Sequence, residues 1–177
     1  MDNHLQHKSA LAPLAKASNG VIKHLDLDGW DFSSYSEIIK RKIINPEAQD
    51  RSNVNSSLLF VGNFTESSLV RADGLVSQFI SFMSKDLFLY HFGRVRTLIW
   101  MEGRVWPHLF AKLGSKIRKK VTVMRELTCD ARIIASTAAI NLPGSRSDSG
   151  MEAIDLEGST DYVRLNEADF TPKVNLS

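Results

Sequence analysis

The chain has 177 residues, of which 43% are hydrophobic and 24% charged, and its formal net charge is +2. This size and composition predict one globular domain with a real hydrophobic core. Cys129 is the single cysteine, which excludes intrachain disulfides and a cysteine-based zinc site. Apart from His4 and His7 near the terminus, the histidines lack metal-ligand spacing, and no apolar run approaches the roughly 18 residues of a membrane span. We therefore expect neither a metal site nor a membrane helix.

The charges are distributed unevenly along the chain. Between His91 and Arg132 there are ten Lys and Arg residues against three acids, a net charge of +7. Between Ser145 and Ser177 there are three basic residues against seven acids, a net charge of −4. A basic region of this kind fits a surface that faces nucleic acid or another acidic partner. A solvated helix face is the alternative.

Helical and extended patterns alternate from the start of the chain. Leu5–Ala17 has the apolar spacing of a short helix, and Asn19-Gly20 can form its C-terminal cap. Val21–Leu25 then predicts a strand, followed directly by Asp26 and Asp28. Acids at the end of a parallel strand can bind a ligand amine or hydroxyl, although more often they only cap the turn.

The middle of the chain continues the alternation. A helix is predicted over Tyr35–Lys42, with Ser33 or Ser34 as its N-cap. The apolar run Leu58–Val61 predicts a strand buried on both faces. Residues 69–84 have helical apolar periodicity.

The remaining predicted elements carry most of the basic residues. Arg94–Met101 is predicted as a strand and Trp106–Leu113 as a short helix behind Pro107. Val121–Ile134 alternates apolar and polar residues, which indicates one half-buried strand or a hairpin. Strands that alternate with helices predict an α/β fold with a doubly wound parallel sheet, and one antiparallel strand near its end.

Asn63 and Phe64 directly follow the predicted Leu58–Val61 strand and Gly62. Ligands of open α/β sheets bind beyond the carboxyl ends of the strands. A carboxamide and an aromatic ring at that position suit a planar ligand such as a base, although an ordinary turn has the same sequence. The basic stretch also contains aromatic residues, which could stack on bases or belong to the core.

Signatures of common nucleotide chemistry are missing from the sequence. There is no Gly-x-Gly, no phosphate-binding loop of the NTPases and no Gly-x-Ser-x-Gly elbow. The residues therefore predict no hydride, phosphoryl or acyl transfer.

Four segments together resemble the rRNA adenine N6-methyltransferase superfamily, and within it the fungal mitochondrial transcription factor B branch. They are DLDGWDFSSYSEIIK, LLFVGNF, LYHFGRVRTLIW and WPHLFAKLGSKIRKKVTVMRELTCDARIIAS. The resemblance covers roughly residues 23–137, with a weaker likeness over 166–176. It implies a Rossmann-like sheet, S-adenosyl-L-methionine as cofactor, and adenine in rRNA as substrate. In the fungal mitochondrial branch it implies an initiation factor for mitochondrial RNA polymerase.

The resemblance also implies roles for particular residues. The enzymes hold the target adenine with an Asn-(Ile/Leu)-Pro-(Tyr/Phe) motif, which corresponds here to Asn63-Phe64-Thr65-Glu66, and only Asn63 matches. Asn63 and Phe64 are thus the catalytic candidates, and Asp26, Asp28 and Asn63 the cofactor-binding candidates. The candidates for nucleic-acid contact are Arg94, Arg96, Lys116, Arg118, Lys119 and Lys120.

If Val21–Asp26 is the family's third strand, the first strands and their glycine loop have no counterpart in this sequence. We therefore expect an incomplete Rossmann-like sheet with one open edge, most of the C-terminal helical domain also lacking. The expected divisions are a helical extension over 1–20, a partial methyltransferase domain over 21–140, a flexible acidic loop over 141–160 and a tail over 161–177.

The expected function is a mitochondrial transcription initiation factor that binds RNA or promoter DNA and the mitochondrial RNA polymerase. The alternatives are an rRNA adenine methyltransferase and a non-functional fragment of one. The degraded Asn63–Glu66 motif and the missing glycine loop rank the factor above the enzyme. A mitochondrial location follows from the resemblance alone.

Overall fold

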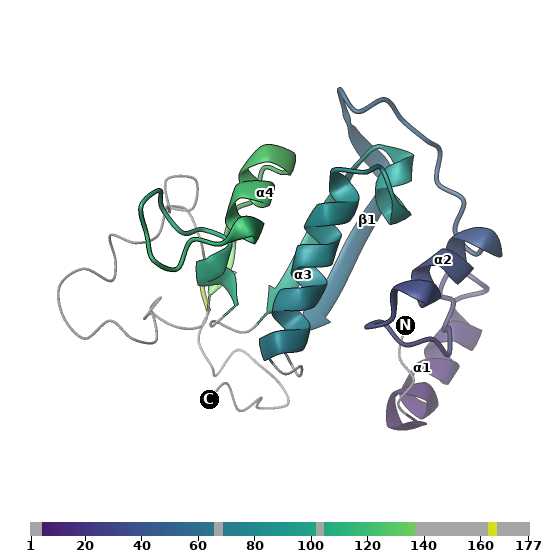
Figure 1. The fold of residues 1–177 in the computed structure, drawn as a ribbon. Helices are drawn as coiled ribbons and strands as arrows, with labels where there is room; N and C mark the ends of the chain where they lie inside the picture. Colours follow the sequence, from purple (N-terminus) through teal and green to yellow (C-terminus); the bar gives the residue numbers. More distant parts are fainter. Residues whose placement is uncertain (1–4, 66–68, 102–104, 137–162, 166–177) are drawn as a thin grey trace.

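A β–α–β unit forms the centre of the computed structural model, which describes residues 5–65, 69–101, 105–136 and 163–165. Strand β1 (Val54–Phe64) and strand β2 (Arg94–Met101) run parallel, and the register leads from Leu59 opposite Arg96 to Phe64 opposite Met101. Helix α3 (Leu69–Met83) lies along this pair (Figure 1). Parallel strands require a crossover connection, and α3 belongs to it.

An aromatic cluster covers one side of α3. Its buried members are Tyr35, Phe64, Leu75, Phe79 and Tyr90. Helix α2 (Phe32–Lys40) contributes Tyr35, and Asp31 caps this helix by accepting a hydrogen bond from the Ser33 amide. Phe79 is only 1% exposed and contacts several rings edge-on or tilted, the arrangements that aromatic pairs prefer.

A second cluster joins α3 to the following segment. Val76 and Ile80 of α3 pack against Leu109, Phe110 and Val121. Val121 belongs to helix α4 (Lys120–Thr128), and the 3₁₀ helix η2 (Trp106–His108) precedes Leu109. Because buried residues of α3 fall on two sides, the helix holds the sheet and α4 together. Beyond α4, the short strands β3 (Ala135–Ser136) and β4 (Val163–Arg164) pair in parallel.

The turn into β2 depends on a glycine. The 3₁₀ helix η1 (Phe88–Phe92) ends at Gly93, whose φ of 107° is strained for any residue with a side chain. A Cβ there would lie 2.6 Å from the carbonyl oxygen of Gln49. Gly93 therefore allows the 49–53 segment to pass close to the start of β2.

Several predicted elements are confirmed. Helix α1 spans Leu5–Ala17, with Asn19 and Gly20 at φ 51° and 85° after it, as a left-handed cap requires. β2 matches the predicted Arg94–Met101, and the predicted helices over Tyr35–Lys42 and 69–84 correspond to α2 and α3. The α/β class with a parallel strand pair is confirmed, whereas the extent of a Rossmann-like sheet stays a prediction.

Two predictions about strands near β1 are wrong. Val21–Leu25 forms no strand, and Val21 and Ile22 are 85% and 48% exposed instead of being buried in a sheet. The strand β1 is not buried on both faces either, since Leu59 and Val61 are 59% and 63% exposed. The reason is that, in the described part of the chain, α3 packs against the other face of the strand pair.

The prediction of a strand over Val121–Ile134 is also wrong, because α4 begins there. The alternating apolar residues that suggested a strand, Val123 and Leu127, are 41% and 77% exposed. The buried residues are instead Val121 and Thr122, with Arg125 partly buried one turn later, which is helical spacing. Around Pro107 the structure forms only the three-residue η2 rather than a helix to Leu113.

The predicted acidic loop and the predicted C-terminal tail fall largely or wholly outside the residues that the structure describes. The predicted loop over 141–160 lies outside the described residues, as does most of the 161–177 tail. Within the described ranges, no helix is long and apolar enough to cross a membrane.

Candidate functional site

Asn63, the predicted base-binding residue, closes a turn at the end of β1. Its side-chain oxygen accepts hydrogen bonds from the Thr65 amide at 3.2 Å and the Thr65 hydroxyl at 2.8 Å. Asn63 is exposed, but this oxygen is engaged within the chain. The turn thus uses the acceptor that an adenine amino group would need.

Phe64 is a core residue. Its side chain is 4% exposed and lies 5.0 Å from the Trp30 ring and 6.2 Å from the Phe79 ring, between centroids. A ring enclosed in this way cannot stack on a ligand. The structure thus disagrees with the role predicted for Phe64, because the aromatic cluster forms around the end of β1.

The loop with Asp26 and Asp28 reaches the same end of β1. The Trp30–Phe64 contact brings it there, and Asp28 accepts a hydrogen bond from the Trp30 amide at 2.8 Å. Next to Asp28, the Tyr35 hydroxyl donates to the Gly29 carbonyl at 2.5 Å. Burial raises the pKa of Tyr35 to about 12, and the charge of Asp28 adds to this shift. Tyr35 is therefore a neutral structural donor.

An open groove lies beside the middle of β1. It has a volume of about 540 Å³ and is lined by Leu58–Phe60, Lys23 and mostly aliphatic side chains. Asp26, Asp28 and Asn63 do not line it. Asp28 and Asn63 instead accept hydrogen bonds within their own turns.

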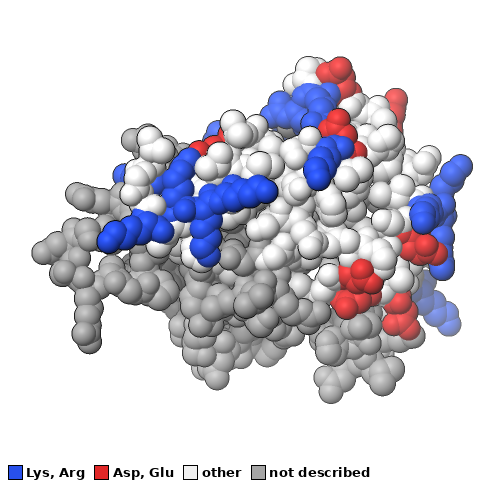
Figure 2. All heavy atoms as spheres, in the orientation of Figure 1, with Lys and Arg blue, Asp and Glu red and all other residues white. Residues whose placement is uncertain are grey.

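The second candidate site is the segment Lys112–Lys120, which we call the basic turn. Lys112, Lys116, Lys119 and Lys120 are all exposed. Figure 2 shows Lys and Arg side chains gathered over the part of the molecule where the basic turn and α4 lie in Figure 1. Lys119 also approaches His108, with 3.3 Å between Nζ and Nδ1.

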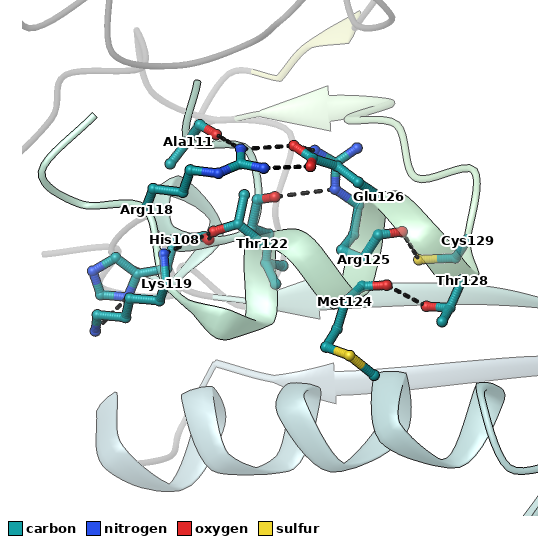
Figure 3. A network of polar contacts seen from close by, with 11 residues as sticks. His108, Ala111, Arg118, Lys119, Thr122, Met124, Arg125, Glu126, Thr128 and Cys129 are labelled. Carbon is teal, nitrogen blue, oxygen red and sulfur yellow. Dashed lines mark hydrogen bonds and ion pairs between the residues drawn. The ribbon is translucent and has the colours of Figure 1, made fainter. Parts of the chain in front are cut away.

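Arg118 differs from the lysines around it. Its guanidinium donates two hydrogen bonds to the Glu126 carboxylate, at 2.8 and 2.5 Å, and a third to the Ala111 carbonyl at 2.8 Å (Figure 3). The Arg118 side chain is only 18% exposed. The hydrogen bonds from Arg118 lower the pKa of Glu126. Arg118 therefore connects the basic turn to α4, and the structure does not present it as a phosphate ligand.

Thr122 and Arg125 fix α4 against the 108–111 segment. The fully buried Thr122 hydroxyl donates to the His108 carbonyl at 2.5 Å and accepts from the Lys119 amide at 3.2 Å. Arg125 donates to the Leu109 carbonyl at 3.1 Å, and its guanidinium lies 4.9 Å from the centre of the Phe110 ring. The sequence analysis missed both residues. The local signal for Thr122 is its place as the third residue of α4, from which its hydroxyl can reach back to the N-cap amide.

Arg94 and Arg96 form a separate group. Both are exposed at the amino end of β2, and Arg94 donates to the Ser52 carbonyl at 3.5 Å. β2 extends about 23 Å at ~3.3 Å per residue before the chain continues toward the basic turn. The six residues predicted to contact nucleic acid thus fall into three groups. Two are arginines on β2, three are exposed lysines of the basic turn, and one, Arg118, is an arginine that holds the basic turn to α4.

The parallel β–α–β unit, followed by the exposed basic turn, belongs to an α/β protein. The family model described as ribosomal RNA adenine dimethylase matches residues 2–175. The chain belongs to this family, as predicted.

Three similar curated proteins are named mitochondrial transcription factor 1. The protein of Saccharomyces cerevisiae is 34% identical over 131 residues, which are 73% of this chain and 38% of that relative. Those of Saccharomyces paradoxus and Lachancea kluyveri are 33% and 30% identical, over 73% and 65% of this chain and 38% and 33% of theirs. These matches support the predicted fungal branch, and the chain spans well under half the length of these relatives.

Proposed function

We propose that this chain acts in mitochondrial transcription initiation as a nucleic-acid-binding factor that works with the mitochondrial RNA polymerase. The names of its relatives support this function and a mitochondrial location. The observation that carries the proposal is the basic turn, whose four exposed lysines project from a base held by Arg118 and Glu126.

The proposed contacts are with phosphates rather than with base faces. Among the aromatic residues in or beside the basic stretch, for which stacking and core packing were the alternatives, Tyr90 and Phe110 are 5% and 6% exposed. Trp106 is partly buried against the α3–α4 cluster. Lysine is a flexible point charge that suits phosphate oxygens, and binding of this kind weakens steeply as salt rises.

The test is a salt titration of binding to a promoter-like DNA duplex and to an rRNA hairpin. The variant Lys116→Gln/Lys120→Gln removes two lysines of the basic turn. Because each lost phosphate contact lowers the slope of log affinity against log salt by about one, we expect a slope reduced by about two. The matched control is Lys40→Gln/Lys85→Gln, which removes two exposed lysines outside the basic turn.

Equal slopes for the wild type and both variants would contradict the proposed role of the basic turn. A preference for DNA over the hairpin supports the transcription factor. Tighter binding of the hairpin would instead favour an RNA substrate, as in the rest of the family.

For methyl transfer, the family depends on S-adenosylmethionine, but we propose that this chain does not carry out the reaction. Support comes from the engaged Asn63 oxygen, the buried Phe64 ring and the missing Gly-x-Gly. Isothermal titration with S-adenosylmethionine should give no binding heat. Micromolar affinity would overturn this part of the proposal.

A further inference from the structure

Leu113 is the most exposed of the large hydrophobic residues in the described ranges, at 89%. It lies in a tight turn that the Ser115 amide closes by donating to the Lys112 carbonyl at 3.1 Å. Gly114 follows with φ 83°, the conformation that the third residue of a type II turn requires. Leu113 thus occupies the tip of the turn, and the glycine after it allows the chain to return.

The residues that follow this tight turn, 115–118, are held in place by hydrogen bonds and by packing. The Arg118 amide donates to the Ser115 carbonyl at 3.1 Å, and the Ile117 amide donates to the Ser115 hydroxyl at 3.3 Å. Ile117 packs against the α3–α4 cluster. The Arg118 side chain adds its bonds to Ala111 and Glu126. The tip therefore projects from an anchored base, in the loop that lies beside α4 in Figure 1.

A single exposed leucine is ordinary on a protein surface. Leu113 differs because the turn holds it outward between two exposed cations, Lys112 and Lys116. The two lysines can each bind a phosphate of a nucleic acid. The apolar leucine between them can then contact the faces of the bases, which are the apolar part of the nucleic acid. Proteins that bend or open nucleic acid use leucine in this way, as a wedge between base steps.

We propose that Leu113 enters the base stack of the nucleic acid whose phosphates the basic turn binds. This inference rests on the proposed function and specifies its ligand as a duplex with a weakly stacked or unpaired step. Unstacking a paired step is costly, so a duplex that contains a mismatch offers the wedge a site at lower cost.

The experiment uses the full chain and a short DNA duplex, either fully paired or with one mismatch, that carries 2-aminopurine next to that step. The variants are Leu113→Ala and the matched control Leu127→Ala, since Leu127 is a 77% exposed leucine on α4 outside the turn. We expect the wild type and Leu127→Ala to bind the mismatched duplex about tenfold more tightly and to raise the 2-aminopurine fluorescence, which reports unstacking.

For Leu113→Ala we expect the preference to fall to about twofold and the fluorescence rise to disappear, with the salt slope unchanged because no cation is lost. Retention of both signals in Leu113→Ala would overturn the inference. If the wild type shows no salt-dependent binding to either duplex, the proposed function itself fails. Vesicles that contain phosphatidylserine form a further arm, and loss of vesicle binding without a change in DNA binding would assign Leu113 to a membrane and also overturn it.

Discussion

The end of β1 and the basic turn both carry polar side chains, but they use them in opposite ways. At the end of β1, Asp28 and Asn63 direct their oxygens into their own turns, and Phe64 belongs to the core. At the base of the basic turn, Arg118 and Glu126 of α4 neutralise each other, while Lys112, Lys116 and Lys120 are exposed. The comparison shows that a residue type suited to a ligand is available to one only where the fold does not use its polar atoms to hold a turn or a core.

The largest effect should come from Phe64→Ala. Removing a buried aromatic side chain costs about 3–5 kcal/mol of unfolding free energy, and the cluster around Phe79 leaves little room to relax. Urea denaturation followed by circular dichroism measures this loss, with Asn63→Ala as the control that should change stability much less. A stable Phe64→Ala protein with weakened ligand binding would show that the ring is a ligand contact after all.

Thr122→Val tests the other side of the comparison. The substitution keeps the shape of a fully buried side chain but removes the hydroxyl that binds the His108 carbonyl and the Lys119 amide. Losing the two hydrogen bonds of this buried hydroxyl costs about 1–3 kcal/mol. Urea denaturation should show this loss, whereas Thr128→Val removes one hydroxyl bond to Met124 in a partly buried position and should cost less. An equal loss for both variants would mean that Thr122 has no special role in anchoring α4.

The smallest effect concerns pH and Glu126. Hydrogen bonds from Arg118 hold the pKa of Glu126 below its ordinary value of 4.5 in the folded chain. The folded state therefore binds this proton less readily than the unfolded state, and the stabilisation is present above pH 4.5 and is lost as pH falls through the lowered value. Denaturation midpoints across this range should fall more steeply for the wild type than for Glu126→Gln. Identical pH profiles would show that the ion pair contributes nothing to stability.

The local sequence pattern was sufficient to predict those helices and strands whose structure is decided by residues close together in the sequence. The helix α1 with its Asn19-Gly20 cap, the extent of β2 and the position of α3 all follow from apolar spacing and turn residues. The Val121–Ile134 segment shows the limit of that reasoning, because Val123 and Leu127 alternate like strand residues but lie on the exposed side of a helix. Burial against α3, not the local pattern, selects the helix there.

The candidate site shows the same division. The basic stretch and its net positive charge were visible in the sequence, and so was the strand over Leu58–Val61 that leads to Asn63. The Arg118–Glu126 pair was not, since one residue lies in a turn and the other in a helix eight positions later. The exposed tip at Leu113 was equally hidden, because a leucine in an apolar pattern predicts burial.

The sequence by itself determined the α/β class, the family and the presence of a basic segment, since these depend on composition, periodicity and local motifs. Tertiary structure alone decided that Phe64 lies inside the core, that Arg118 is neutralised by Glu126, and that Leu113 projects into solvent. The physical reason is that burial and ion pairing depend on which segments meet in space. Identical side chains acquire different roles according to the partners that packing brings to them.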